Sequence, residues 1–325
     1  MGELTLRLRP LAPFRLDLTA WAIRRRPHNT IDHFDGETWR RVVIINDHPV
    51  AISVRQIGPL KSTEIEVVAI GENVSRLGAS SIEALLNRIL GLNIDLRGLY
   101  WLAREDASIG ALVNRLQGMK PVRFPTNFEA LINAVACQLV SLTAGMHVVN
   151  RIAAKYGRAC EVDGVAMHAC PEASAIARAE VEDLRALGLS RSKARYLIGL
   201  AQIASESDPD FRSMELLSDD DAIAALSKFA GVGRWTAEYV LLRGFGRVNI
   251  FPGDDVGGRN GLRDFLGLRD DLDYAGVREA LARWRAWGGF IYFHLLVNAL
   301  AEKGIVGVSS KTKKGDRDGT QEHQS

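Results

Sequence analysis

The sequence predicts an α+β protein in which a mixed α/β N-terminal domain precedes an all-helical domain. Before residue 120, short runs alternate apolar and polar residues or are rich in β-branched residues, as strands are. After residue 126, apolar residues recur at helical spacing almost without interruption. The segment 121–129, PVRFPTNFE, carries two prolines between the two patterns, so we place the domain boundary between residues 120 and 121.

Three segments of the N-terminal domain are expected to form a sheet. Residues 4–8 alternate like a half-buried strand, and residues 64–70, EIEVVAI, are a further strand candidate. Residues 41–54 hold two β-branched runs around the sequence Asn-Asp-His-Pro, which indicates a hairpin. Helical periodicity is found in residues 17–26 and 81–90.

The second domain, residues 121–307, opens with Thr126-x-x-Glu129, a capping box that starts a helix. The tail, residues 308–325, has no apolar periodicity and is expected to be disordered. Helices are expected over residues 127–142, 143–157, 171–179, 180–187, 191–205, 219–229, 235–246, 258–266, 275–286 and 288–302.

The bulk composition is that of a soluble globular protein, with 47% apolar and 25% charged residues. No run of about 18 apolar residues indicates a membrane span, and the first residues, MGELTLRLRP, lack the apolar core of a signal peptide. We therefore expect a cytoplasmic protein that has no membrane partner. We also expect a monomer, although the sequence does not reveal the oligomeric state.

The cysteines Cys137, Cys160 and Cys170 are too few and too scattered for a disulfide framework. His168 and Cys170 form an H-x-C pair near Cys160, but no CxxC or HxxxH spacing accompanies them, so no zinc site is expected. The four closely spaced cysteines of an iron–sulfur cluster are absent from the sequence. The sequence therefore implies neither a metal nor a cofactor.

The formal net charge is only +2. Proteins that bind DNA mainly by Coulomb attraction are strongly basic, because neutralising phosphates drives such binding. If this chain binds DNA, main-chain N–H groups and a few placed cations have to make the backbone contacts.

Residues 227–260, SKFAGVGRWTAEYVLLRGFGRVNIFPGDDVGGRN, carry the most chemical information. Gly231 and Gly233 lie between two helical patterns and suit a tight hairpin, since glycine adopts positive φ and leaves amides uncovered. Amides at the start of the helix near Trp235 can bind one DNA phosphate, helped by the helix dipole. The alternative is an ordinary turn between helices. A nucleotide-binding GxGxxG is excluded, because position 236 is threonine and no strand precedes the hairpin.

A proline-glycine loop with two adjacent carboxylates, Asp254 and Asp255, follows the second helix of the hairpin. Cleavage of a glycosidic bond builds positive charge on the sugar, and a nearby anion stabilises that charge. The alternative is that these aspartates only cap the helix that begins at Val256.

The run 231–239, GVGRWTAEY, followed by Phe251-Pro252 and Asp255, resembles the helix-hairpin-helix, Gly/Pro-rich loop and aspartate signature of the DNA glycosylase superfamily. Within it, the chain is similar to the bacterial DNA-3-methyladenine glycosylase II family. The resemblance spans residues 1–305 and implies a TBP-like mixed α/β domain, a helical glycosylase domain and damaged duplex DNA as the partner. Further likeness lies in residues 123–131, 137–141, 187–190 and 193–194.

The resemblance implies that Asp255 is the catalytic carboxylate, with Asp254 as a rival. It also implies a base pocket lined by Trp235, Tyr239 and Trp287, whose π faces attract a cationic methylated purine. Trp235 and Tyr239 share one helix face, so core packing is the alternative reading for both. The arginine and tyrosine that often follow the family's pocket tryptophan are replaced here by Gly288 and Phe290, which leaves the base specificity open.

By the same resemblance, Gln138 is a polar group of the pocket and Leu139 is the side chain that wedges into the duplex. An apolar plug offsets part of the cost of extruding a base, while core packing is the alternative for Leu139. Lys193 and Arg234 are expected phosphate contacts. The hairpin residues Gly231, Gly233 and Thr236 complete the expected DNA-binding set.

Bifunctional relatives place a Schiff-base lysine near the start of the second hairpin helix, but no lysine occurs between Gly231 and Asp255. We therefore expect a monofunctional DNA glycosylase that flips alkylated purines, such as 3-methyladenine and 7-methylguanine, and hydrolyses their N-glycosidic bond. Two alternatives stay open: a glycosylase for oxidised or deaminated bases, and a non-catalytic protein that binds lesions or shapes DNA.

Overall fold

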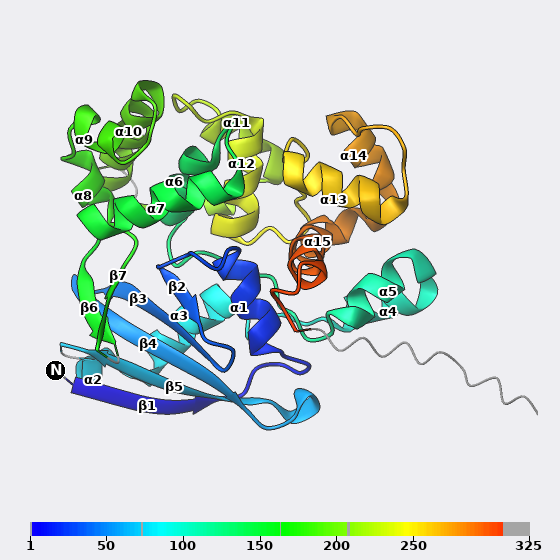
Figure 1. Ribbon diagram of the computed structural model, residues 1–325, viewed down its shortest axis with the longest axis horizontal. Coiled ribbons are helices and arrows are strands. Elements are labelled where there is room, and N and C mark those ends of the chain that lie inside the picture. The colour runs from blue at the N-terminus through cyan, green and yellow to red at the C-terminus, as the bar shows by residue number, and fades with distance from the viewer. Residues whose placement is uncertain (1, 73, 163, 207–208, 308–325) are drawn as a thin grey trace, which may run out of the picture.

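The computed structural model describes residues 2–72, 74–162, 164–206 and 209–307, so the tail expected to be disordered lies outside the described residues. A five-stranded antiparallel sheet of order β1-β5-β4-β3-β2 forms the N-terminal part, and most helices lie above it in Figure 1. This is the α+β fold that the sequence predicts. The strands are β1 (Gly2–Leu8), β2 (Asp32–Phe34), β3 (Thr38–Ile45), β4 (His48–Ile57) and β5 (Glu64–Gly71).

The predicted hairpin in residues 41–54 is confirmed as the β3–β4 pair. Ile45 pairs with His48, which leaves Asn46 and Asp47 as a two-residue loop. Both loop residues have positive φ, 48° and 62°. A two-residue hairpin turn of this kind matches the twist of the strands, and Asn and Asp tolerate it better than other non-glycine residues.

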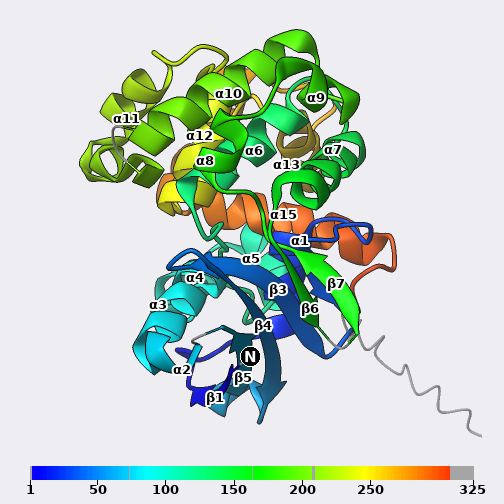
Figure 2. The ribbon, with the colours of Figure 1, turned by 90° about the vertical axis from the view of Figure 1, so that its left-hand side faces the viewer.

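The two faces of the sheet are covered by different elements. Val43 and its same-face neighbours join the main core with α1 (Leu16–Arg24) and α3 (Ala79–Leu90), whereas Val42 points to the opposite face. That opposite face is covered by a second hairpin, whose strands lie across β3 and β4 in Figure 2. The hairpin consists of β6 (Ala159–Val162) and β7 (Val165–His168).

The expectation of an almost wholly helical chain after residue 126 is wrong at this hairpin. The sequence ACEVDGVAMH places Asp-Gly between two alternating runs, which is a hairpin signal. The strands reach back from the helical part and bury Cys160, Val162 and Met167 against the sheet. The hairpin therefore ties the two parts of the chain together.

The helices α4 (Arg97–Glu105) and α5 (Ala107–Arg115) leave the sheet and lie beneath α15 (Gly288–Glu302) in Figure 1. None of the described helices is long and apolar enough to cross a membrane. The remaining helical segments are α2 (Val74–Leu77), η1 (Leu60–Ser62), α6 (Asn127–Cys137), α7 (Leu142–Tyr156), α8 (Ala173–Ala177), α9 (Val181–Ala186), α10 (Arg191–Glu206), η2 (Pro209–Leu216), α11 (Asp219–Leu226), α12 (Arg234–Val240), η3 (Leu241–Phe245), α13 (Val256–Leu266), α14 (Tyr274–Ala280) and η4 (Ala282–Trp287).

The predicted helix 127–142 ends early, at Cys137. Leu139 has φ 55°, in the left-handed region, so the helix cannot continue through it. A new helix, α7, starts at Leu142, where the hydroxyl of the N-cap Ser141 accepts from the Ala144 amide at 3.2 Å. The short break between α6 and α7 points Leu139 away from the core.

Only one of the two hydrogen bonds of the predicted capping box forms at the start of α6. The Thr126 hydroxyl accepts from the Glu129 amide at 3.0 Å, as expected. The Glu129 carboxylate does not turn back to Thr126 but pairs with Arg41 of β3, which also binds Asp32 at 2.9 Å. All three charged side chains are buried, so this ion-pair cluster fixes α6 to the sheet.

Candidate active site

The hairpin between α11 and α12 is built around one glycine that no other residue can replace without strain. Gly231 has φ 82°, and a Cβ added there would overlap the ring of Tyr196. Gly233 is different: it is the N-cap of α12 with extended backbone, and a Cβ there would meet open space. The first hydrogen bond of this helix is from Ala237 to Gly233, so the amides of residues 234–236 precede the helical ladder.

Gln138 links the end of α6 to this hairpin. Its side-chain amide donates to the carbonyl of Gly231 at 2.8 Å and to the hydroxyl of Thr236 at 3.0 Å. Thr236 is buried as a whole residue, so its hydroxyl serves Gln138 and does not face solvent. Gln138 thus holds the hairpin, and its place in the base pocket stays a prediction.

Lys193, at the start of α10, caps the end of α6. Its ammonium donates to the carbonyl of Gln138 at 2.6 Å and to that of Ala136 at 3.4 Å. Burial lowers the pKa of Lys193 below its ordinary value. The side chain that the sequence assigned to a phosphate therefore serves a helix C-terminus in this structure.

Leu139 projects fully into solvent. Its exposed fraction is 104%, the largest of any large hydrophobic side chain in the described chain. This exposure rules out the alternative of core packing. An apolar side chain held in water by a left-handed backbone, one residue from the hairpin-binding Gln138, has the form of a wedge.

Asp255 is held at two points and lies beside the predicted aromatic residue. It is the N-cap of α13, where its Oδ1 accepts from the Gly258 amide at 2.6 Å. Its Oδ2 accepts from the indole Nε1 of Trp235 at 3.1 Å. The capping alternative is therefore correct as geometry, yet it does not compete with a chemical role, because the cap orients the half-buried carboxylate toward α12.

Asp254 has a different environment. Its carboxylate forms an ion pair with Arg234 at 2.7 Å, and the Arg234 guanidinium lies 3.6 Å from the ring centroid of Tyr274. The Arg234 side chain is half-exposed, and it already contacts the Asp254 carboxylate and the Tyr274 ring. Of the two adjacent acids, Asp255 is the one without a cationic side chain paired to it in the described structure.

The rings of Trp235 and Tyr239 are adjacent, with centroids 5.5 Å apart, as their spacing on one helix face predicts. Tyr239 is only 3% exposed, so core packing describes most of its surface, whereas Trp235 is half-buried. Trp287 is placed elsewhere. Its indole lies over Gly98 of α4 and is edge-on to Phe290 at 5.2 Å, and no ring contact joins it to the other two in the described residues.

The end of η4 sets the direction of the Trp287 side chain. Trp287 is the N-cap of α15 with φ −117°, and its side chain turns onto the surface that Gly98 leaves free. The described structure therefore does not bring Trp287 together with Trp235 and Tyr239, and its place in the base pocket stays a prediction.

Two buried arginines lie behind the aromatic pair, and the sequence analysis did not find them. Arg25, at the end of α1 with φ 62°, donates to the Tyr239 hydroxyl at 2.8 Å and also binds Asn133. Arg243 packs on the rings of Tyr239 and Phe293, with centroid distances of 5.6 and 4.8 Å. One signal was available: residues 235, 239 and 243 follow each other at i, i+4 and i+8 on one helix face.

The third missed residue is Tyr292 of α15. Burial raises its pKa well above the ordinary value, and the negative charge of Asp255 raises it further. Its ring is edge-on to Phe251 at 5.4 Å, in the loop that leads to Asp255. A phenol in an apolar helix gives no sequence signal for a site.

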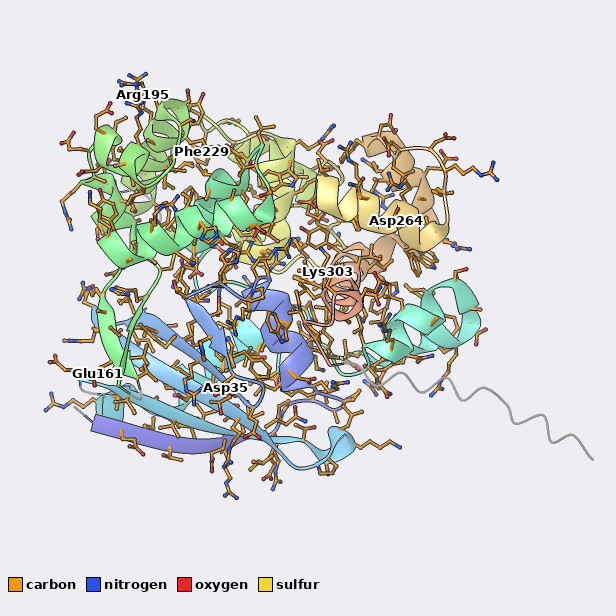
Figure 3. All side chains as sticks on the ribbon, in the orientation of Figure 1. Asp35, Glu161, Arg195, Phe229, Asp264 and Lys303 are labelled. Atoms are coloured by element: carbon orange, nitrogen blue, oxygen red, sulfur yellow. The ribbon has the colours of Figure 1, made fainter. Side chains whose placement is uncertain are left out.

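The site lies in the helical part, away from the outer edge of the sheet. Figure 3 labels Phe229, which precedes the hairpin, in the upper half of the molecule, and Asp35 and Glu161 in the lower half. In the described residues, no group of three or more His, Cys, Asp or Glu side chains is arranged to hold a metal ion.

The chain combines a mixed α/β part, a helix-hairpin-helix and an aspartate in the loop after it. Comparisons with known proteins find this combination in base excision DNA repair proteins. Residues 132–286 match the family model described as HhH-GPD superfamily base excision DNA repair protein. DNA-3-methyladenine glycosylase 2 of Escherichia coli is 30% identical over 203 residues, which cover 61% of this chain and 68% of that protein. The chain belongs to the HhH-GPD superfamily of base excision DNA repair proteins.

Other relatives agree with this assignment. The DNA-3-methyladenine glycosylase of Bacillus subtilis is 26% identical over 204 residues, or 63% of this chain and 67% of that protein. The matches thus span about two thirds of these relatives' length. The 3-methyladenine DNA-glycosylase of Archaeoglobus fulgidus is similar over 90% of this chain and 97% of its own, with 25% identity and a TM-score of 0.78. An 8-oxoguanine glycosylase/lyase of Clostridium acetobutylicum shares the fold, with 17% identity and a TM-score of 0.74.

Proposed function

We propose that this chain is a monofunctional DNA glycosylase that removes alkylated purines, such as 3-methyladenine and 7-methylguanine, from duplex DNA. The observation that carries the proposal is the position of Asp255. Two N–H donors hold its carboxylate beside Trp235, and Trp235 lies on α12, the helix that follows the hairpin. The names of the relatives support the same substrate class.

In this proposal the Asp255 carboxylate lies next to the deoxyribose of a flipped nucleotide. As the bond from C1′ to the base breaks, positive charge builds on the sugar, and the fixed carboxylate stabilises it. Each oxygen of Asp255 accepts one hydrogen bond from the protein, so the carboxylate does not have to reorganise during the reaction. The cationic base leaves as a neutral molecule with the electron pair of the broken bond, and water forms the new bond to C1′ and gives one proton to solvent.

The DNA is held and opened by the elements next to this acid. The amides of residues 234 and 235, which precede the helical ladder at the exposed start of α12, bind one phosphate at the hairpin. Leu139 enters the duplex and fills the space that the flipped base leaves. Because the hairpin amides supply backbone contacts, a chain with a net charge of +2 needs few exposed cations for this grip.

The absence of lyase activity is part of the proposal. No lysine occurs between Gly231 and Asp255, and the nearby Lys193 ammonium is engaged with the carbonyls that end α6. A Schiff base needs a free amine next to C1′. We therefore expect base release without strand cleavage.

The test compares Asp255→Asn with Asp273→Asn on methylated duplex DNA. Asp273 is also a helix N-cap whose Oδ1 accepts from a glycine amide, at 2.7 Å, so it is a matched control for the cap. Asparagine caps helices as well as aspartate does. Asp255→Asn is expected to lower single-turnover release of 7-methylguanine by about 10²- to 10³-fold while DNA binding persists, and Asp273→Asn is expected to act like the wild type.

Two results would contradict the proposal. One is tight DNA binding by the wild type with no released base, as a non-catalytic lesion-binding protein would give. The other is a covalent protein–DNA adduct when the same reactions are run with borohydride, because the adduct traps a Schiff base and reveals a lyase.

A further inference from the structure

Tyr292 is the buried side chain of the site that the proposed mechanism leaves without a task. It lies on α15, is 9% exposed, and its ring edge-on contact with Phe251 fixes its plane. A Cβ added to Gly258 would come within 3.0 Å of the Tyr292 Cε2 atom. The Gly258 amide is the donor that holds Asp255, so the phenol lies next to the glycine that positions the carboxylate.

The hydroxyl of Tyr292 has no hydrogen-bond partner in the described part of the chain. Its oxygen is also not fully enclosed by protein atoms, unlike the hydroxyl oxygen of Tyr156. The hydroxyl oxygen is therefore reachable by solvent although the ring is buried. A buried phenol normally satisfies its O–H within the protein, so this one is free for a ligand.

The charges behind the aromatic pair favour a particular kind of ligand. Arg25 and Arg243 are buried, and both contact Tyr239 from inside the protein. A guanidinium stays protonated even where burial lowers its pKa, as it does for Arg243. The guanidinium packed on the Tyr239 ring weakens the attraction of that ring for a second cation. The two guanidiniums also attract negative charge.

These observations point to stabilisation of a departing base that carries negative charge. A purine methylated at N3 or N7 is cationic in the nucleoside and leaves as a neutral molecule. A neutral purine adduct leaves with the electron pair of the glycosidic bond and is anionic at that moment. Its departure needs a hydrogen-bond donor or positive charge next to the ring.

We propose that the Tyr292 hydroxyl donates a hydrogen bond to a ring nitrogen of the departing base and so extends excision to neutral modified purines. The C1′–N bond breaks, and its electron pair stays on the base. The phenol keeps its proton and only shares it. Water forms the new bond to C1′, one of its protons goes to solvent, and the base takes up a proton to become neutral.

This inference rests on the proposed glycosylase function and concerns the same site. The test uses two duplexes, one with 7-methylguanine, which is cationic, and one with 1,N6-ethenoadenine, a neutral adduct. Single-turnover release is measured for the wild type, Tyr292→Phe and Tyr156→Phe. Phenylalanine keeps the ring packing of Tyr292, and Tyr156→Phe removes a phenol hydroxyl at the end of α7, which does not contact Asp255 in the described structure.

The expected result is a change in a ratio. Tyr292→Phe lowers release of ethenoadenine relative to release of 7-methylguanine by about 10²- to 10³-fold, the effect of removing one positioned donor. Tyr156→Phe leaves the ratio at its wild-type value. Thermal unfolding and DNA affinity of Tyr292→Phe are measured alongside, because a merely structural role would lower both releases equally.

The outcomes separate this inference from the proposed function. If the wild type releases neither base, the proposed function fails. If the wild type releases 7-methylguanine but no ethenoadenine, or if Tyr292→Phe leaves the ratio unchanged, the proposed function stands and the role of Tyr292 is overturned.

Discussion

Leu139 is kept in an unfavourable position by the residues around it. The left-handed φ of 55° strains a non-glycine backbone, and the exposed side chain gains nothing from burial in the free protein. Ser141 restarts the chain as the cap of α7, and Lys193 closes the end of α6. Strain that the surrounding structure maintains at one exposed apolar residue is a mark of function.

We predict that Leu139→Ala lowers excision from duplex DNA by about tenfold, or about 1.4 kcal/mol of barrier. The loss arises because nothing fills the gap that the flipped base leaves. Release from single-stranded DNA is expected to change little, since no stack has to be opened. Val165→Ala, at an exposed apolar residue of the β6–β7 hairpin, is the control, and an equal loss on both DNA forms would refute the wedge role.

The sequence located the residues of the site that lie within one short stretch of chain. Trp235 and Asp255 are 20 positions apart, and their contact follows from a hairpin, a helix and a loop. Arg25 is 214 positions from Tyr239, and no local pattern links them. A residue brought in by tertiary packing leaves no periodic or motif signal, which is why Arg25 and Tyr292 were missed.

The two glycines of the hairpin have different structural roles. Gly231 provides a backbone that only glycine adopts freely and lets the Tyr196 ring approach. Gly233 needs neither, since its backbone is extended and the space at its Cβ is empty. The empty space lies at the start of α12, where the phosphate is expected to approach.

We therefore predict opposite outcomes for two glycine substitutions. Gly231→Ala is expected to lower the free energy of unfolding by about 1–3 kcal/mol, because it strains the turn and overlaps Tyr196. Gly233→Ala is expected to keep the stability and weaken DNA binding, because its methyl group covers the amides. Chemical denaturation and DNA titration separate the two effects. Equal behaviour of both variants in both assays would contradict the assignment.

The sequence predicts the bounds of most helices to within a few residues. It does not predict a break in a helix that depends on contacts with distant residues. The end of α6 at Cys137 needs the ammonium of Lys193 and the backbone of Leu139. The periodicity of residues 127–142 contains neither. The β6–β7 hairpin was missed for another reason, because its Asp-Gly signal lay inside a region already assigned to helices.

The whole molecule depends on contacts that cross between the sheet and the helical part. Arg41 of β3 and Glu129 of α6 are 88 positions apart and are both buried, with Asp32 as the second acid. Burial raises the pKa of Glu129, and the charge of Arg41 opposes that rise. The cluster lies at the base of α6, and the other end of α6 carries Gln138 and the hairpin.

We predict that Glu129→Gln destabilises the fold by about 3 kcal/mol, because breaking a buried ion pair leaves Arg41 with too little compensating charge. Glu182→Gln is the control: it breaks the exposed pairs of Glu182 with Arg185 and Arg191 and is expected to cost less than about 1 kcal/mol. Urea denaturation of both variants measures the difference. If Glu129→Gln costs no more than the surface control, the buried pair does not join the sheet to α6, and the position of the hairpin has to be maintained by the apolar contacts of α6 alone.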